Sequence, residues 1–340
     1  MKLIRENAKK FEGIPLSVLD LVQVREEDTP ADAIENSAKL IRRADELGFN
    51  RYWLAEHHNF EGIASSATAV LIGRLASESK EIRVGSGGVM LPNHAPLIIA
   101  EQFGTLDAMY PGRIDLGLGR APGTDQQTMW ALRRNLKGGP DEFPRDVAEL
   151  EAYFEGGEDM PVRAFPGDGQ DIPIWLLGSS GFSAQLAARK GLPFSFASHF
   201  APGYMDAALD LYRSGFEPSG KMEKPHAMPG VNVLIADTQE EAEYLITTHM
   251  QQFLSIIRNS RGKMQPPVED IEQLWTPYER QYVMQTLDPR TTLFGTKDKV
   301  REGLLRLIEE TQADELIVNT VAYDTDKRIR SYELLAEMMD

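Results

Sequence analysis

Short apolar runs alternate along the chain with longer stretches in which apolar residues recur every three or four positions. The short runs are typical of strands buried on both faces, and the longer stretches are typical of helices that bury one face. The alternation predicts a series of strand–helix units. We expect strands at residues 15–21, 52–55, 82–91, 113–119, 172–178, 193–198, 230–236 and 315–320.

A helix is expected after each of these strands. Gly48 and Gly191 each follow a helical pattern and precede an apolar run, and glycine in this place ends a helix without a Cβ penalty. Eight alternating units predict the α/β class and a (β/α)8 TIM barrel. The helices are expected at 33–47, 68–76, 97–109, 146–153, 180–190, 205–212 and 239–257, followed by a closing helix up to Met339.

One segment departs from this rhythm. Residues 259–293 carry Pro266, Pro267, Pro277 and Pro289 among scattered charges. We predict that they form an insertion between the seventh helix and the eighth strand. Because the eighth strand must pair with the first to close the sheet, residues 1–340 are predicted to form a single domain.

Composition and charge narrow the class of partner. The chain has 42% hydrophobic residues, enough for a large core, and a formal net charge of −16. That charge argues against nucleic acid and anionic membrane as partners, although a local arginine cluster could still bind a small phosphorylated ligand. The absence of cysteine excludes disulfides, thiolate metal sites and a cysteine nucleophile. Without a signal peptide or a long apolar run, a cytoplasmic location is expected.

Polar and titratable residues gather where the predicted strands end. In TIM barrels the carboxyl ends of the strands form the working face, so these residues are predicted to line one barrel mouth. Four of the six histidines belong to this group. The polar residues are Glu56, His57, His58, Asn93, His94, Arg120, Ser179, Ser180, Ser198 and His199, and Gly119 and Gly178 lie at the same strand ends.

The stretch GSSGFSAQLAARKG (178–191) runs from an apolar strand through small residues into a helix. The free N–H groups and the dipole of a helix start favour an anion, whereas a plain serine N-cap would have the same sequence. With Arg120 and Arg145 on neighbouring loops, a phosphate site is the better interpretation.

Two other patterns leave alternatives. The glycines of GSGG (85–88) indicate either a β-bulge or close approach of a ligand to the backbone. GLGRAPG (117–123) lacks the spacing of a dinucleotide fingerprint and has a proline where a helix should open.

The pair His57–His58 raises the question of a metal site with Glu56 and His94. Adjacent residues on a regular strand point to opposite sides, so the pair cannot easily chelate one ion. We therefore predict no metal, and assign the cluster to binding a polar ligand or transferring a proton, with a structural histidine as the alternative.

Several stretches together resemble the bacterial luciferase-like flavin monooxygenase family, in order along most of the chain. They are WLAEHH (53–58), VGSGGVMLPNHAPLIIAEQFGTLDAMYPGRIDLGLGRAPG (84–123), GSSGFSAQLAARKGLPF (178–194) and FGTKDKVREGLLRLIEETQADELIVNT (294–320). The resemblance implies FMN at the barrel mouth, used in reduced form as a co-substrate, with a deazaflavin as the alternative cofactor.

The resemblance also implies roles for individual residues. It implies that His57 lies beside the reactive edge of the flavin as a catalytic residue, that Glu56 orients it, and that Gly87–Gly88 forms a non-prolyl cis peptide under the ring. The positions implied to hold the flavin phosphate are Arg120, Arg145, Gly178, Ser179, Ser180 and Ser183.

We therefore expect a flavin-dependent monooxygenase that uses O2 on an apolar organic substrate. The substrate loops are expected to include Trp130, Phe200 and Trp275. Since no Rossmann unit for a nicotinamide cofactor is evident, a separate reductase is expected to supply the reduced flavin, and the resemblance implies a homodimer. Light-emitting members carry a cysteine where this chain has Gly119, which argues against light emission. A deazaflavin-dependent hydride-transfer enzyme and a non-enzymatic flavin-binding protein remain alternatives.

Overall fold

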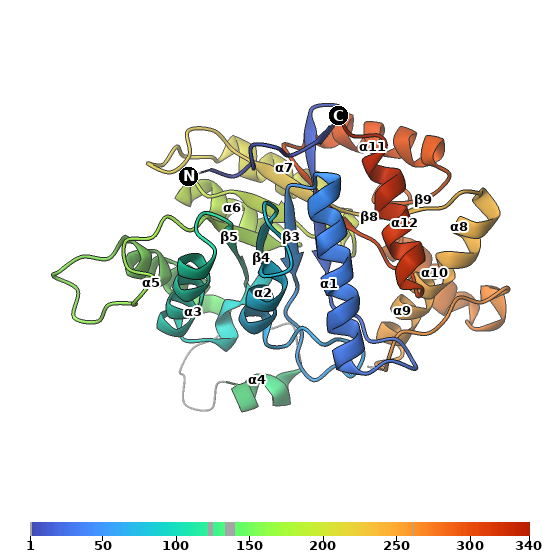
Figure 1. Ribbon diagram of the computed structural model, residues 1–340, viewed down its shortest axis with the longest axis horizontal. Helices are drawn as coiled ribbons and strands as arrows, with labels where there is room; N and C mark the ends of the chain where they lie inside the picture. The colour runs from blue at the N-terminus through green and yellow to red at the C-terminus, as the bar shows by residue number, and fades with distance from the viewer. Residues whose placement is uncertain (1, 122–124, 133–139, 261) are drawn as a thin grey trace.

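The computed structural model describes residues 2–121, 125–132, 140–260 and 262–340, and its strands form a closed parallel barrel (Figure 1). The strands follow one another around the ring in chain order, and the last pairs with the first. They are β2 (Ile14–Asp20), β3 (Arg51–Leu54), β4 (Arg83–Met90), β5 (Ile114–Gly119), β6 (Ile174–Gly178), β7 (Phe194–Phe196), β8 (Ala227–Ile235) and β10 (Leu316–Asn319).

Helices surround this ring, with α1, α2 and α12 in front of the strands in Figure 1. They bury their apolar faces against the sheet, which explains why the strands are apolar on both faces. The helices after successive strands are α1 (Pro30–Leu47), α2 (Thr68–Ala76), α3 (Pro96–Met109), α5 (Phe143–Glu155), α6 (Gly181–Lys190), α7 (Met205–Ser214), α8 (Gln239–Leu245) with α9 (Thr247–Ile257), and α12 (Thr325–Ala336).

The predicted TIM barrel and all eight of its predicted strands are confirmed. The prediction of one helix over 239–257 was wrong, because the chain breaks at Ile246 into α8 and α9. Two elements were not predicted: β9 (Thr292–Gly295), which pairs with the second half of β8, and α11 (Lys297–Thr311). The expected insertion at 259–293 contains α10 (Pro277–Thr286), and its status as an insertion within one domain stays a prediction.

Local chemistry sets the ends of α1. Thr29 and Asp32 form a capping box, in which each side chain accepts from the backbone N–H of the other residue. Gly48 ends the helix at φ 95°, in the left-handed region that glycine adopts most readily. The chain then enters β3 directly.

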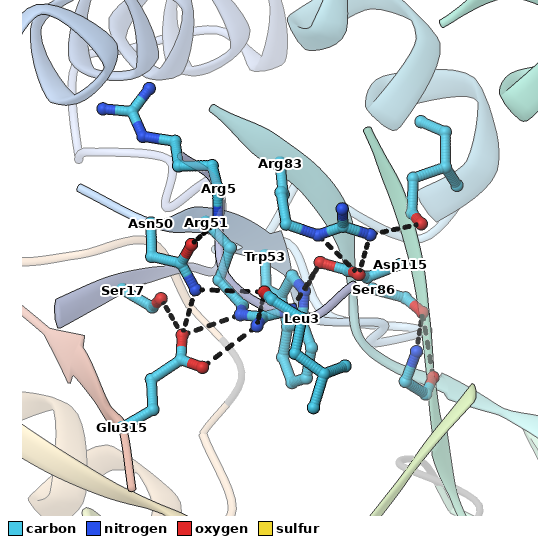
Figure 2. Close-up of polar contacts among 12 residues, drawn as sticks. Leu3, Arg5, Ser17, Asn50, Arg51, Trp53, Arg83, Ser86, Asp115 and Glu315 are labelled. Carbon is cyan, nitrogen blue, oxygen red and sulfur yellow. Dashed lines mark hydrogen bonds and ion pairs between the residues drawn. The ribbon is translucent and has the colours of Figure 1, made fainter. Parts of the chain in front are cut away.

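Charged side chains close the amino-terminal end of the barrel interior (Figure 2). Arg51, at the start of β3, is fully buried and forms ion pairs with Asp115 (2.6 Å) and Glu315 (2.7 Å). Its guanidinium lies over the rings of Trp53 and Trp175, 5.3 and 4.5 Å from their centroids. This network lies inside the barrel at the amino ends of the strands. The candidate site lies at the other end of the barrel, where the strands finish.

Further donors surround the same two carboxylates. Arg83 contacts Asp115 at 2.6 Å, and Asn50 and His226 contact Glu315 at 2.9 and 3.2 Å. Burial opposes ionisation of Glu315, but Arg51 and the hydrogen bond from His226 outweigh it and hold the pKa of this carboxyl well below its usual range. The network is therefore buried, and its two arginines balance the charge of its two carboxylates.

Within the described residues, no helix is long and apolar enough to cross a membrane.

Candidate active site at the barrel mouth

Glu56, two residues beyond β3, is the polar centre of the opposite end of the barrel. Its side chain is 2% exposed, and one carboxylate oxygen, Oε1, lies 2.7 Å from Nε2 of His58 and 2.8 Å from Nε2 of His94. The other oxygen, Oε2, accepts the backbone N–H of Met90 at 3.1 Å. Glu56 thereby ties the end of β3 to the end of β4 and to the segment before α3.

The Glu56 carboxyl is ionised at neutral pH. Burial opposes its ionisation, but the hydrogen bonds from His58 and His94 outweigh the burial and lower the pKa to about 2. A buried carboxylate in this state accepts hydrogen bonds and cannot donate one.

The backbone between Gly87 and Gly88 lies beside this cluster, on β4. Their peptide bond is cis, as the resemblance implied. A Cβ on Gly88 would lie 2.7 Å from the carbonyl oxygen of Gly117, and one on Gly87 would lie 2.9 Å from Cδ1 of Leu19. The pairing of β4 with β5 shifts register between Ser86 and Val89, so the glycines lie at an irregularity of the strand, as a β-bulge would produce.

A cationic side chain lies at the start of α6. The Arg120 guanidinium, just beyond β5, stacks on the ring of Phe182 in the first turn of α6, 4.2 Å from its centroid. Ser180 is the N-cap residue of this helix, but its side chain makes no capping hydrogen bond, so the plain N-cap interpretation was wrong. The first-turn N–H groups of α6 thus have no side-chain cap and lie beside a guanidinium.

Arginine and serine residues predicted to hold phosphate differ in their placement. Ser179 and Ser180 are exposed at the helix start, whereas Ser183 is buried against Gly178. Arg145, at the start of α5, has a 62% exposed side chain and pairs with Glu142 and Asp146 of its own neighbourhood. The structure therefore brings Arg120 to the α6 start, while the contacts of Arg145 are local.

This geometry can be compared with known proteins. The profile of the family described as luciferase-like monooxygenase matches residues 14–315. The chain belongs to the luciferase-like monooxygenase family. A luciferase-like monooxygenase of Escherichia coli is 52% identical over 96% of this chain and 97% of its own length. An N-acetyl-S-alkylcysteine monooxygenase of Bacillus subtilis is 34% identical over 95% of this chain and 98% of its own.

Several solved structures share the fold of this chain. Apo-MsnO8 is 36% identical, with a TM-score of 0.89 over 96% of this chain and 98% of its own. More distant barrels are the oxygenating constituent of 3,6-diketocamphane monooxygenase from Pseudomonas putida, solved with FMN (17% identity, TM-score 0.69, 95% and 97% covered), and an F420-dependent secondary alcohol dehydrogenase, solved with an F420–acetone adduct (14%, 0.69, 96% and 99%). These last two support the fold alone.

In this luciferase-like barrel, the candidate residues lie at the strand ends where they were predicted, but Glu56 has other partners than the one expected. Glu56 was expected to orient His57, whereas in the structure its carboxylate contacts His58 and His94. His57 is partly buried at the same strand end, and its catalytic role stays a prediction. His94 was named at a strand end, but a pairing across 38 residues depends on how β3 and β4 align.

The aromatic residues expected in the substrate loops of this luciferase-like enzyme differ in how far their side chains are exposed. The large hydrophobics Trp130 and Phe200 are 70% and 49% exposed. Trp275 instead packs partly buried against the cluster formed by α9 and α10. Trp275 is therefore part of a packed element. The proline and last glycine of the GLGRAPG stretch (117–123) lie outside the described residues.

Proposed function

We propose that this protein is a flavin-dependent monooxygenase that uses reduced FMN and O2 on an apolar organic substrate. The observation that carries the proposal is Arg120 stacked beside the start of α6, whose N-cap side chain leaves the helix uncapped. A guanidinium and free helix N–H groups are a donor set that suits a phosphate dianion. The family match and the FMN found in a structurally similar monooxygenase agree with it.

The proposal assigns a separate role to each group of residues. Arg120, Ser179 and Ser180, with the N–H groups of α6, would hold the phosphate, and Arg145 would join them on binding. Gly178 and Ser183 shape the turn, Gly87 and Gly88 keep the floor under the ring free of side chains, and His57 would move a proton at the reactive edge. Bound reduced FMN would supply the electrons that activate O2.

Replacing Arg120 by Ala is expected to weaken FMN binding by ~1.5–3 kcal/mol, roughly ten- to more than a hundredfold, because a charge-assisted contact to phosphate is lost. Riboflavin, which lacks the phosphate, should lose much less affinity. Fluorescence titration of both flavins measures the difference. Arg163→Ala is a control for the loss of an arginine that stacks on an aromatic ring, that of Phe165 at 4.7 Å, and its folding is checked separately because Arg163 also pairs with Asp168.

Equal losses for FMN and riboflavin would remove the phosphate role of Arg120. Unchanged FMN affinity, together with a loss in Arg163→Ala, would place the cofactor elsewhere on the protein.

A deazaflavin is the second candidate cofactor, because a structurally similar dehydrogenase was solved with F420. We expect reduced FMN to bind more tightly than reduced deazaflavin, as measured by equilibrium titration under anaerobic conditions. The opposite order would make the protein a hydride-transfer enzyme. Oxidation of bound flavin that yields only hydrogen peroxide, with every organic substrate tried, would favour a flavin-binding protein without oxygenase activity.

The proposal includes the partners that such a reaction needs. A separate reductase would supply reduced FMN in the cytoplasm, and the barrel would act as a homodimer. Sedimentation of the purified protein tests the dimer, and a reconstituted assay with and without a reductase tests the supply of flavin.

A further inference from the structure

One carboxylate oxygen holds two histidine rings at the barrel mouth. Oε1 of Glu56 lies 2.7 Å from Nε2 of His58 and 2.8 Å from Nε2 of His94. These are hydrogen-bond lengths for an N–H donor and an ionised acceptor. Both rings therefore direct the same ring nitrogen at the same atom.

This arrangement determines where the ring hydrogens lie. An ionised carboxylate has no hydrogen to donate, so each Nε2 must carry the hydrogen of its own contact. A neutral imidazole carries only one N–H, and its other nitrogen is then a base. In the neutral state, Nδ1 of His58 and Nδ1 of His94 are therefore the basic atoms of the cluster.

The same three groups also lie close enough for a metal ion, with one ligand atom from each within 4.8 Å of the others. Metal ligation would require bare Nε2 atoms, each about 2.0–2.1 Å from the ion, with the carboxylate oxygen at a similar distance. Here the oxygen itself occupies the place between the two nitrogens, at hydrogen-bond length from both. The geometry favours N–H donors over metal ligands.

The two rings differ in their access to the mouth. The side chain of His94 is 25% exposed and that of His58 is 12% exposed, while the carboxylate that holds them is 2% exposed. A molecule bound at the mouth can therefore reach His94 more readily than His58, and Glu56 least of all. The same arrangement, in which a buried carboxylate orients a more accessible histidine base, occurs in catalytic triads.

We propose that Glu56 is a positioning residue that fixes His58 and His94 as Nε2–H tautomers, so that His94 accepts a proton at Nδ1 from the molecule bound at the mouth. The proton would move from that molecule to Nδ1, and the resulting imidazolium would keep its Nε2–H on the Glu56 carboxylate. Release of the proton to solvent restores the neutral ring. The tautomer assignment stands on the contacts alone, and the proton transfer rests on the proposed oxygenase function.

Ring-nitrogen NMR of histidine-labelled protein tests the tautomers without flavin or oxygen. At about pH 9, His58 and His94 should each show a protonated Nε2 and a bare Nδ1. His58→Gln and His94→Gln assign the signals. A protonated Nδ1 on either ring in the unaltered protein would overturn the assignment, and this spectrum suffices even if a variant does not fold.

The variant Glu56→Gln tests whether the carboxylate sets the tautomers of the two rings. The glutamine oxygen can accept from one ring, but its NH2 group must face the other, so one of the two rings should change tautomer. His226, paired with Glu315 at the other end of the barrel, should keep its signals. Unchanged signals for both His58 and His94 would show that Glu56 does not set their tautomers. Stoichiometric Zn²⁺ binding that is lost in Glu56→Gln would assign the cluster to a metal and overturn the proposal.

Kinetics test the proton transfer. His94→Gln should lower turnover at saturating reduced FMN about 100-fold or more, with FMN affinity changed less than about twofold. Glu56→Gln combined with His94→Gln should be no slower than the slower single variant, because the two residues act as a unit. Glu46→Gln, on the exposed face of α1, should behave like the unaltered protein.

The two levels of the proposal fail in different ways. Unchanged turnover in His94→Gln, in a protein that oxygenates its substrate, would remove His94 as the base and leave the oxygenase function intact. Absence of oxygenation in the unaltered protein would remove the proposed function while the NMR result on Glu56 still stands.

Discussion

Replacing Glu315 by Gln is expected to lower the free energy of unfolding by about 3–5 kcal/mol. The substitution keeps the shape of the side chain and removes its charge. Arg51 would then remain fully buried with only Asp115 to balance it, although Asp115 is also shared with Arg83. Breaking one partner of a buried ion pair costs much more than the pair contributes, because the remaining charge stays out of water.

Urea denaturation followed by circular dichroism measures this loss as a shift of the midpoint. Glu46→Gln is the matched control, since Glu46 pairs with Arg43 on the surface, where both side chains are well exposed. The control should change the stability by about 1 kcal/mol or less. A similar small change for both variants would show that the barrel floor does not depend on balanced charge.

The position of Arg51 illustrates what the sequence does not contain. The apolar run next to it, YWLA (52–55), predicts a buried strand, and the structure confirms one over Arg51–Leu54. Whether the arginine lies inside the barrel depends on the carboxylates that neutralise it. Asp115 and Glu315 are 64 and 264 residues away, and only the closed ring brings them to Arg51. The sequence offers one indication: Arg51 is two residues before Trp53, so both side chains lie on the same face of the strand.

Regular alternation made the barrel predictable, and its interruptions were missed. Each barrel strand is an apolar run beside a helical pattern, whereas β9 follows a proline-rich segment. The helix α11 has a clear amphipathic pattern, but the eight-unit count was already complete without it. The break at Ile246 has no glycine or proline to mark it.

The candidate site was predictable in outline for the same reason. The rule that strand ends share one face of the barrel placed Glu56, His94 and Arg120 together. The rule gives no side-chain partners, so Glu56 was assigned to its neighbour in sequence. The structure instead joins Glu56 to His94, which lies at the end of the adjacent strand.

Replacing His249 by Leu is expected to reduce the loss of stability on acidification by roughly 2 kcal/mol between pH 6.5 and 4.5. His249 is 3% exposed in α9. Burial, with a smaller contribution from nearby His199, lowers the pKa of its ring to about 3. The unfolded chain would bind a proton near pH 6.5, so between these values protons favour the unfolded state, and stability falls with pH. Below about pH 3 both states are protonated and this contribution no longer changes.

The measurement is the difference in unfolding free energy between the two pH values, because leucine also changes packing at every pH. Phe253→Leu controls for packing, since its ring lies 5.1 Å from that of His249 and does not titrate. The control should lower stability equally at both pH values, whereas His249→Leu should flatten the pH dependence. His199, whose pKa burial lowers to about 4, remains in both variants and accounts for the slope that persists. Parallel pH profiles for the unaltered protein and His249→Leu would mean that His249 gains a proton without unfolding, through local opening of α9 rather than loss of the barrel.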